Sequence, residues 1–461
     1  MNTASANVAA RLESVAGADR VSAGAEICDK YAVDGVAPSA VVKPASVEEV
    51  AEMVRFAKSE KLALIACGNR TKLGIGMPPA RYDFALDMTG LNRIAYYDPD
   101  DLTLSVDAGI GLADLAETLA KENQFVPLAV PFFEECTVGG TIASGIGSML
   151  RNSYGSGRDF LLGAEFVNDA GALTKSGGRV VKNVTGYDLH KLLIGSLGTL
   201  AVITRLNFRT FPIPQSCGRL VATFSSNEAI LKFQAAIAKS PLTPNSFQIL
   251  GPEAAQRLGE FEQERDAPLP SWFAPGHWHV CVGFEGAEPV LRRYSSDLVQ
   301  YAKQSGAASC HLLEKSVSES LGGGLRELLK LLSWSGPAAT VFKIDMLPAF
   351  PVDILRLREL ANRLAIPCAI FANLPGPLYF ALERKALDDG SIATLAQIAS
   401  SVFEYAASHS GQASILFCHA ELKRLVNVWG PARKDAELMR RVKTAFDPQN
   451  IFAPGRFVAG I

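Results

Sequence analysis

The sequence has no long apolar run and no excess of either charge. Nowhere do 18 apolar residues follow one another, and residues 1–20 lack the apolar core of a secretory signal. Lys and Arg (45) nearly balance Asp and Glu (47), so the formal net charge is -2 and no basic stripe could follow a phosphate backbone. We therefore expect a cytoplasmic globular protein without a transmembrane segment or a nucleic-acid partner; partner subunits could still bring it to a membrane.

Paired cysteines are missing as well. The chain has no C-x-x-C pair and no Cys/His spacing of the zinc or iron–sulfur kind. The eight cysteines are spread almost evenly, as Cys28, Cys67, Cys136, Cys217, Cys281, Cys310, Cys368 and Cys418. This pattern predicts free thiols in a reducing compartment.

The common cofactor and catalytic motifs are also absent. No G-x-G-x-x-G follows a predicted strand, no G-x-x-x-x-G-K-[ST] occurs, and there is no H-E-x-x-H, G-x-S-x-G or EF-hand loop. The usual Rossmann and P-loop interpretations therefore fail. At 461 residues the chain is too long for one hydrophobic core, so two or three domains are expected.

The N-terminal half has clear secondary-structure signals. The capping box Ser46-Val47-Glu48-Glu49 predicts a helix over 47–59, and the short apolar run 62–66 predicts a buried strand. Alternation around 102–106 predicts a half-buried strand, and a helix over 112–122 follows it. Further on we expect a β-hairpin that starts at 160–167, with its turn at 168–171, and a strand over 200–211. Pro212-Ile213-Pro214 is the predicted domain boundary.

Beyond this boundary strands and helices alternate in an α+β rhythm. The predicted pairs are a strand over 218–224 with a helix over 228–238, and a strand over 279–284 with a helix over 289–304. A third unit runs from Thr340 through a helix near 354–364, and a fourth ends with a strand over 414–418. This spacing fits two ferredoxin-like halves. The apolar C-terminus follows a helix over 434–444 and is expected to fold back onto a domain.

Two glycine-containing segments have the chemistry to hold a diphosphate. The first is 67–74, directly after a predicted strand, and the second is 137–145. Glycine lets backbone N–H groups approach phosphate oxygens, Asn and Thr add donors, and Arg70 or Lys72 can balance negative charge. The alternatives are a simple turn for the first and an Ω-like surface loop for the second. Between 137 and 157 the glycines are too frequent to predict a regular helix or strand.

Six motifs occur in the order in which the vanillyl-alcohol oxidase/p-cresol methylhydroxylase (PCMH) superfamily carries them. They are Val41-Val42-Lys43-Pro44, the loop Cys67 to Gly74, Val106-Asp107-Ala108-Gly109, Thr137-Val138-Gly139-Gly140, Ser153-Tyr154-Gly155 and Gly195 to Thr204. The stretch 41–214 therefore resembles the FAD-binding domain of that superfamily. Within it, 177–189 and the closing segment from Asp447-Pro448 to Pro454-Gly455-Arg456 most resemble the FAD-binding subunits of glycolate oxidases. The likeness is weakest over 215–432.

The resemblance implies an α+β fold, with a PCMH-type FAD-binding domain of two subdomains followed by a ferredoxin-like α+β cap domain. The implied division is a lead segment over 1–37, the FAD-binding domain over 38–214, the substrate or cap domain over 215–432, and a C-terminal segment over 433–461 that folds back on the FAD-binding domain. FAD would be held non-covalently, because covalent members of the superfamily use a histidine in or near the first loop and none stands there here.

The same resemblance assigns cofactor residues. Gly68, Asn69, Arg70 and Thr71, flanked by Cys67 and Lys72, would hold the pyrophosphate; Thr137, Gly139, Gly140 and Ser144, with Ala143, would line the ribityl and diphosphate side; and Val202 and Ile203 would meet the adenine through their backbone. Tyr154 and Arg158 lie where the chain would approach the flavin ring.

Catalytic residues are harder to find. Related 2-hydroxy acid dehydrogenases carry a histidine- and glutamate-rich set in the C-terminal domain, and this chain offers little of it. His419 with Glu421, near the end of a predicted strand, and His277 with His279 are spaced i,i+2, which on a strand would place each pair on one face and suit a metal. The alternative is partly exposed polar residues, and we expect no metal. Only Tyr154, Arg158 and His419 remain as catalytic candidates.

These observations leave three functional hypotheses. The first is the FAD-binding subunit of a glycolate or 2-hydroxy acid dehydrogenase complex, in which a sister FAD-linked oxidase subunit oxidises the small 2-hydroxy acid and an iron–sulfur subunit carries electrons onward. The second is a self-sufficient FAD-dependent oxidase or dehydrogenase of a hydroxy acid or sugar alcohol. The third is an assembly subunit in which FAD is structural. Turnover by the chain alone would separate the first two, and a flavin that substrate never reduces would support the third.

Overall fold

A small, mostly parallel sheet forms one end of the molecule. The computed structural model describes residues 3–179, 186–267, 269–273, 276–333, 339–346, 358–359, 361–362, 366–383 and 388–461. The sheet has the order β1-β2-β4-β3 and consists of β1 (Val21–Ser22), β2 (Ala40–Val42), β3 (Leu64–Cys67) and β4 (Phe84–Asp87). α1 (Thr3–Ala16), α2 (Ala25–Asp29), α3 (Val47–Glu60) and the 3-10 turn η1 (Met88–Gly90) accompany it. The predicted helix and buried strand are confirmed, and the hydroxyl of Ser46 accepts the N–H of Glu49 at 3.1 Å to start α3.

The second sheet is antiparallel and has the order β5-β6-β10-β8-β9. Its strands are β5 (Ile94–Asp98), β6 (Thr103–Asp107), β8 (Leu161–Val167), β9 (Leu173–Gly177) and β10 (Val202–Arg209). α4 (Leu112–Ala120), α5 (Val138–Ser144), α6 (Arg151–Tyr154), α7 (Gly157–Phe160) and α8 (Leu189–Leu192) belong to the same part of the chain. The predicted hairpin is confirmed as β8 and β9, which pair in antiparallel register. The predicted segment 177–189 falls partly outside the described residues.

Two expectations for this region are wrong. β6, an inner strand between β5 and β10, is buried at all five positions, including the polar face that was expected to be exposed; Asp107 on that face accepts a hydrogen bond from Arg205 at 2.8 Å. The segment after Thr137 is a regular helix, α5, although it contains Gly139 and Gly140. Its glycines serve packing: a Cβ on Gly139 would lie 2.7 Å from the carbonyl oxygen of Ala108. Tertiary contact here outweighs low helix propensity.

The chain then crosses to an eight-stranded antiparallel sheet, order β15-β12-β14-β13-β17-β18-β16-β19. At the crossing, β7 (Gln124–Phe125) pairs with β11 (Phe211–Pro212). The strands of the large sheet are β12 (Ser216–Phe224), β13 (Ser246–Leu250), β14 (Trp278–Gly286), β15 (Ser309–Leu312), β16 (Thr340–Asp345), β17 (Cys368–Leu374), β18 (Leu378–Leu382) and β19 (Gln412–Phe417). Numbered within each half, both halves read 4-1-3-2, and they join edge to edge through β13 and β17. The expected pair of ferredoxin-like halves is confirmed.

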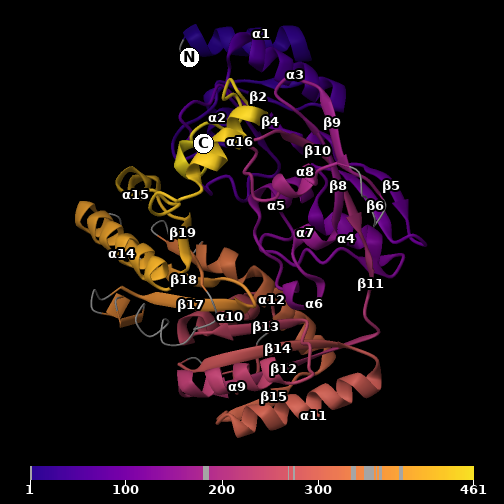
Figure 1. Ribbon diagram of the computed structural model, residues 1–461, viewed down its shortest axis with the longest axis vertical. Helices are drawn as coiled ribbons and strands as arrows, with labels where there is room; N and C mark the ends of the chain where they lie inside the picture. Colours follow the sequence, from indigo (N-terminus) through magenta and orange to yellow (C-terminus); the bar gives the residue numbers. More distant parts are fainter. Residues whose placement is uncertain are drawn as a thin grey trace.

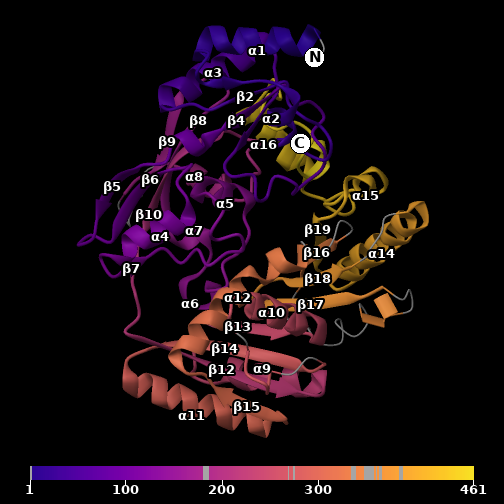
Figure 2. The same ribbon diagram turned by 180° about the vertical axis from the view of Figure 1, so that it is seen from behind.

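Helices cover both faces of this sheet, which we call the cap sheet. α9 (Asn227–Lys239), α11 (Glu288–Gln304) and α14 (Asp389–Ser408) pack on one face. α10 (Pro252–Glu264) and α12 (Lys315–Ser333) pack on the other, which faces the two smaller sheets (Figures 1 and 2). The helix expected near 354–364 falls outside the described residues. Among the helices described, none has both the length and the apolar character that a bilayer span requires.

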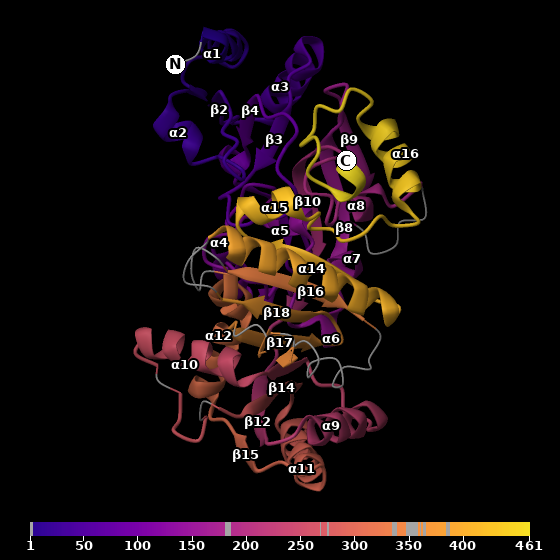
Figure 3. The ribbon, with the colours of Figure 1, turned by 90° about the vertical axis from the view of Figure 1, so that its left-hand side faces the viewer.

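The last segment returns to the first two sheets, where Figure 3 shows it beside β3 and β8. It contains α15 (Ala420–Leu425), α16 (Ala436–Phe446) and the turn η2 (Val458–Gly460). Leu64 of β3 exchanges backbone hydrogen bonds with Ile451 and Ala453. Lys443 is buried and donates to the carboxylate of Asp447 at 2.6 Å, to the carbonyl of Thr199 at 2.7 Å and to that of Phe452 at 3.0 Å.

We predict that this buried ion pair holds the C-terminal return in place. Lys443→Met should lower the free energy of unfolding by about 3–5 kcal/mol, because it leaves the carboxylate of Asp447 buried without its cation. The matched control is Arg440→Met in the same helix, where the Arg440–Glu437 pair is exposed and should contribute less than about 1 kcal/mol. Urea unfolding measures both, and equal losses would contradict the prediction.

Candidate functional site

Two adjoining pockets lie between the loop after β3 and helix α5. They are lined by Ala66, Cys67, Gly68, Asn69, Arg70, Thr71, Lys72, Leu73, Met88, Ala108, Thr137, Gly139, Gly140, Ala143, Ser144, Leu197, Gly198, Ala201, Ile203 and Arg456. Every cofactor residue predicted from the sequence is among them except Val202, which is buried one position before Ile203 in β10. Residues from distant parts of the chain, including Arg456, thus meet at one place.

The loop after β3 presents free backbone donors. Arg70 has a φ of 63°, in the left-handed region, and this reversal turns successive N–H groups toward one side. Within the described part of the chain, none of the four N–H groups from Asn69 to Lys72 donates to a protein acceptor. Consecutive free N–H groups of this kind form an anion-binding nest.

Two buried cations stand beside these donors. Lys72 is 9% exposed, and its Nζ lies 3.2 Å from the hydroxyl of Thr71 and 5.5 Å from the ring centre of Phe132. Burial lowers the pKa of Lys72, against the opposing effect of Cys136, Glu327 and Glu135. Arg456 is 3% exposed and donates to the carbonyl of Ile75 at 2.6 Å, yet its Nε has no acceptor. An anion in the pocket would supply an acceptor for this Nε and further countercharge for both cations.

Glycines give the site its room. A Cβ on Gly68 would lie 2.1 Å from the hydroxyl oxygen of Thr137, so only glycine allows the loop to approach the start of α5. Thr137 caps that helix by accepting the N–H of Gly140 at 3.2 Å. A Cβ on Gly140 would meet nothing nearer than this hydroxyl oxygen, at 3.1 Å, and Gly198 has open space at the same position. The pockets are therefore a cradle that larger side chains would fill.

Sequence analysis missed two residues that contribute to this site. Arg456 belongs to a motif that was noticed, but it was not assigned to the site. Lys423 of α15 had no signal at all; it is 4% exposed and donates to the carbonyl of Gly74 at 2.6 Å and to Asp34 at 2.8 Å. Both cations reach the loop from the C-terminal segment and fix its end.

A third pocket opens from the first toward the cap sheet, and the two share Ser144 and Leu197. Its cap side includes Lys343, Asp345, Tyr379, Gln412, Ser414 and Arg433. Lys343 pairs with Asp345 at 2.9 Å, and Arg433 pairs with Asp435 at 2.8 Å. Burial raises the pKa of Tyr379, so its phenol is protonated near neutral pH. This mixed polar wall faces the space next to the cradle.

The three catalytic candidates lie apart from one another. The phenol of Tyr154 donates to Glu285 of the cap sheet at 2.6 Å, and Arg158 donates to the carbonyl of Lys191 at 3.0 Å. Neither lines the three pockets above. His419 lines a separate polar pocket that also includes Thr71 and Gly74.

The two histidine-containing pairs that were considered as metal candidates do not lie on one face of a strand. His419 is the N-cap of α15 and accepts the N–H of Glu421 at 3.3 Å, because the chain has already left β19. His277 is exposed before β14 begins, whereas His279 is buried, stacks on Phe273 at 4.2 Å and lies 3.2 Å from the hydroxyl of Thr223. The described residues contain no group of three or more ligands suited to a metal ion.

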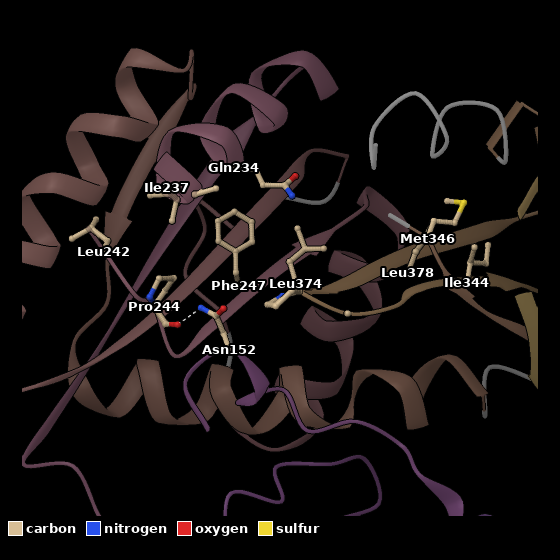
Figure 4. A pocket seen from close by; sticks show the side chains of 13 residues that line it. Asn152, Gln234, Ile237, Leu242, Pro244, Phe247, Ile344, Met346, Leu374 and Leu378 are labelled. Atoms are coloured by element: carbon tan, nitrogen blue, oxygen red, sulfur yellow. Dashed lines mark hydrogen bonds between the residues drawn. The ribbon is translucent and has the colours of Figure 1, made fainter. Parts of the chain in front are cut away.

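A different kind of cavity lies beside α9 on the far face of the cap sheet (Figure 4). Its wall is mainly apolar and includes Ile237, Phe247, Ile344 and Leu378, while the amide of Asn152 donates to the carbonyl of Pro244 at its edge. No charged side chain lines it among the described residues. It has none of the donors that an anionic cofactor requires.

Comparison with known proteins agrees with this geometry. Residues 38–177 match the family described as FAD binding domain, and residues 427–457 match the family described as FAD linked oxidases, C-terminal domain. The first match covers the loop after β3 and helix α5, which form the cradle. The second match contains Arg456 and the ion pair of Lys443 with Asp447.

Several curated proteins resemble the chain. Glycolate oxidase subunit GlcD of Bacillus subtilis is 22% identical over 92% of this chain and 89% of its own. A D-lactate dehydrogenase of Archaeoglobus fulgidus is 27% identical over 91% of each chain. Glycolate oxidase subunit GlcE of Escherichia coli is 35% identical over 39% of this chain, which spans about half (51%) of that subunit.

Among solved structures, p-cresol methylhydroxylase with bound substrate superposes with a TM-score of 0.77 over 99% of this chain and 97% of its own. Sequence identity to it is 16%, so the likeness shows the fold alone. The expected PCMH-type fold with its cap is confirmed.

We predict that a side chain at position 140 will displace the cofactor. Gly140→Met should abolish FAD retention, because the new side chain projects into the cradle, while its Cβ needs only a small shift of the Thr137 hydroxyl, 3.1 Å away. The matched control is Gly259→Met in helix α10, where a Cβ meets nothing within 4 Å and no cofactor residue is near in sequence. The ratio of absorbance at 450 nm to that at 280 nm measures retention in the purified proteins; a yellow Gly140→Met protein would remove the assignment.

Proposed function

We propose that this chain, an FAD-linked oxidoreductase with an FAD binding domain over residues 38–177, is the FAD-binding subunit of a 2-hydroxy acid dehydrogenase that passes electrons to an iron–sulfur partner. One observation carries the cofactor part: four free backbone N–H groups, two buried cations and a side-chain-free position at Gly140 surround one cradle. A diphosphate needs donors, countercharge and close backbone approach, and the cradle has all three.

The residues that would hold FAD follow from this arrangement. The N–H groups of residues 69–72, with Lys72 and Arg456, would bind the pyrophosphate. Thr137, Gly139 and Gly140 would leave room for the chain of the cofactor on the α5 side, and Ile203 closes the far end. When bound, the isoalloxazine supplies the redox chemistry, and the protein supplies orientation and electrostatics. We infer non-covalent attachment, because no histidine lies in the loop.

The hydroxy acid part of the proposal is supported by the relatives. Their names include glycolate oxidase, D-lactate dehydrogenase and D-2-hydroxyglutarate dehydrogenase. The third pocket adjoins the cradle and has the polar wall that a small hydroxy acid would need. Tyr379 is neutral there and can donate a hydrogen bond, but it cannot serve as a base near neutral pH.

The proposal that this chain is one subunit of a complex is supported by the side chains that line the third pocket. Its two basic side chains, Lys343 and Arg433, already pair with carboxylates of the chain itself. No histidine is among its described lining residues. A substrate carboxylate and a substrate proton therefore find few free partners, which favours oxidation in a sister FAD-linked subunit. The likeness to both GlcD and GlcE supports such a complex. Since the cysteines lack iron–sulfur spacing, an iron–sulfur partner would carry the electrons.

A self-sufficient dehydrogenase is the second candidate. The match to the D-lactate dehydrogenase of Archaeoglobus fulgidus extends over 91% of both chains, cap included, and favours it. An assembly subunit with structural FAD is the remaining possibility.

The decisive measurement is the visible spectrum of the purified chain, recorded before and after anaerobic addition of glycolate or D-lactate. We expect a flavin spectrum that substrate does not bleach until partner subunits are added, and a yellow supernatant after acid precipitation because the flavin is not covalently bound. A spectrum without flavin, even after added FAD, would refute the proposal. Bleaching of the isolated chain would establish the self-sufficient enzyme instead, and a flavin that no complex reduces would establish the assembly role.

A further inference from the structure

Arg219 of β12 is a buried cation without a partner. It is 9% exposed, and neither its Nε nor its Nη1 has an acceptor. Four other lysines and arginines are buried to a similar degree in the described chain, and each of them donates to an oxygen. They are Lys72, Lys423, Lys443 and Arg456. Among these five, only Arg219 has no side-chain hydrogen bond to a described residue.

A buried arginine without a partner lowers the stability of the folded protein unless a bound group supplies the opposite charge. An uncompensated charge in a folded protein destabilises it by several kcal/mol. Burial lowers the pKa of Arg219, and only the thiols of Cys281 and Cys217 oppose this effect. Among the described residues, no carboxylate forms an ion pair with it. Glu285, two residues beyond the position paired with Arg219, directs its two oxygens to Tyr154 at 2.6 Å and to Asn245 at 2.7 Å instead.

The neighbouring strands add more unpaired polar groups. Arg219 pairs in register with Gly283 of β14, and Gly283 pairs with Ser246 of β13. Ser246 is fully buried and its hydroxyl has no partner. Gln248, two residues along the same strand, is 1% exposed, and neither its amide nitrogen nor its oxygen has a partner. Alternation along the strand places these side chains on one face of the sheet.

Two glycines frame this group. Gly283 lies on the sheet between Arg219 and Ser246, and a Cβ there would be 2.4 Å from the hydroxyl oxygen of Ser246, so this hydroxyl lies over the glycine on the side of Arg219. Gly322 of α12 lies above, where a Cβ would be 2.9 Å from Nη2 of Arg219. This face is the one that α12 and α6 cover, between the cap sheet and the FAD-binding half (Figure 1). The unpaired groups therefore lie inside the molecule.

We propose that Arg219, Ser246 and Gln248 form a binding site for a small carboxylate anion. The planar guanidinium carries the charge opposite to that of a carboxylate, and its parallel N–H groups match the spacing of the two carboxylate oxygens. A halide ion is a single sphere and cannot accept both N–H groups in this geometry. The amide of Gln248 and the hydroxyl of Ser246 can donate hydrogen bonds to the lone pairs of the carboxylate oxygens that the guanidinium does not use. Water could satisfy the neutral groups but brings no countercharge.

This site is separate from the cofactor cradle. None of its three residues lines the pockets at α5 or the pocket that opens from them toward the cap sheet. The inference does not depend on the proposed dehydrogenase function, because it rests on unpaired groups of the cap alone.

The test is thermal unfolding of the chain saturated with FAD, so that the nest at residues 69–72 is occupied, in a carboxylate-free buffer titrated with acetate. We expect acetate to raise the Tm of the wild type in a saturable way, from which an apparent Kd follows. Arg219→Met should bind acetate about 100-fold more weakly, since it loses hydrogen bonds to a charged group, and without acetate it should be at least as stable as the wild type. Arg293→Met, an exposed arginine on α11, is the matched control and should behave like the wild type.

A second variant, Gln248→Met, keeps the arginine and tests the proposal even if Arg219→Met fails to fold. It should weaken acetate binding about tenfold. Three results would overturn the proposal. These are no stabilisation of the wild type by acetate, equal stabilisation of wild type and Arg219→Met, or equal stabilisation by chloride or phosphate at the same ionic strength. A large loss of stability in Arg219→Met without any anion would also contradict it, since it would mean that the protein itself satisfies the arginine.

Discussion

The close approach of the loop after β3 to the start of α5 is the constraint on which the site depends. Gly68 touches Thr137, and Gly139 touches the backbone of Ala108, at distances that no Cβ would permit. Because these backbones meet, the free N–H groups of residues 69–72 and the open face of Gly140 border the same space. A side chain at Gly68 or Gly139 would force these backbones apart, and one at Gly140 would fill the space beside them.

The approach is completed by residues from the other end of the chain. Arg456 reaches the carbonyl of Leu73, 383 positions earlier, and Lys443 reaches that of Thr199 across 244 positions. Lys423 likewise reaches the carbonyl of Gly74 across 349 positions. Until the C-terminal segment has returned, the loop lacks Arg456 and Lys423, so the cradle becomes complete only when the whole chain is folded.

Local signals explain how much of the fold could be predicted from the sequence. The capping box at Ser46, the hairpin at Asn168 and the alternating units beyond Pro214 all depend on neighbouring residues, and those elements were predicted correctly. Errors occurred where tertiary contact decides. Glycines argued against a helix at α5, yet contact with Ala108 requires one of them inside that helix. His419 was placed on a strand that had already ended at Phe417. Arg219 gave no signal, because burial without a partner has no pattern in sequence.

The polar contacts between the two halves limit how the protein can work. Glu327 of α12 is buried and accepts the N–H of Phe132 at 2.7 Å and that of Phe133 at 3.1 Å, just before the start of α5. Tyr154 contacts Glu285, Asn152 donates to Pro244 and Lys330 pairs with Glu135, so several polar contacts hold the cap beside the cradle. Moving the cap away would exchange the hydrogen bonds of Glu327 for bonds to water, at a net cost of about 0.5–1.5 kcal/mol for each bond and more where the acceptor is charged. These contacts therefore favour the arrangement in which residues of the cap sheet form one wall of the third pocket, next to the cradle.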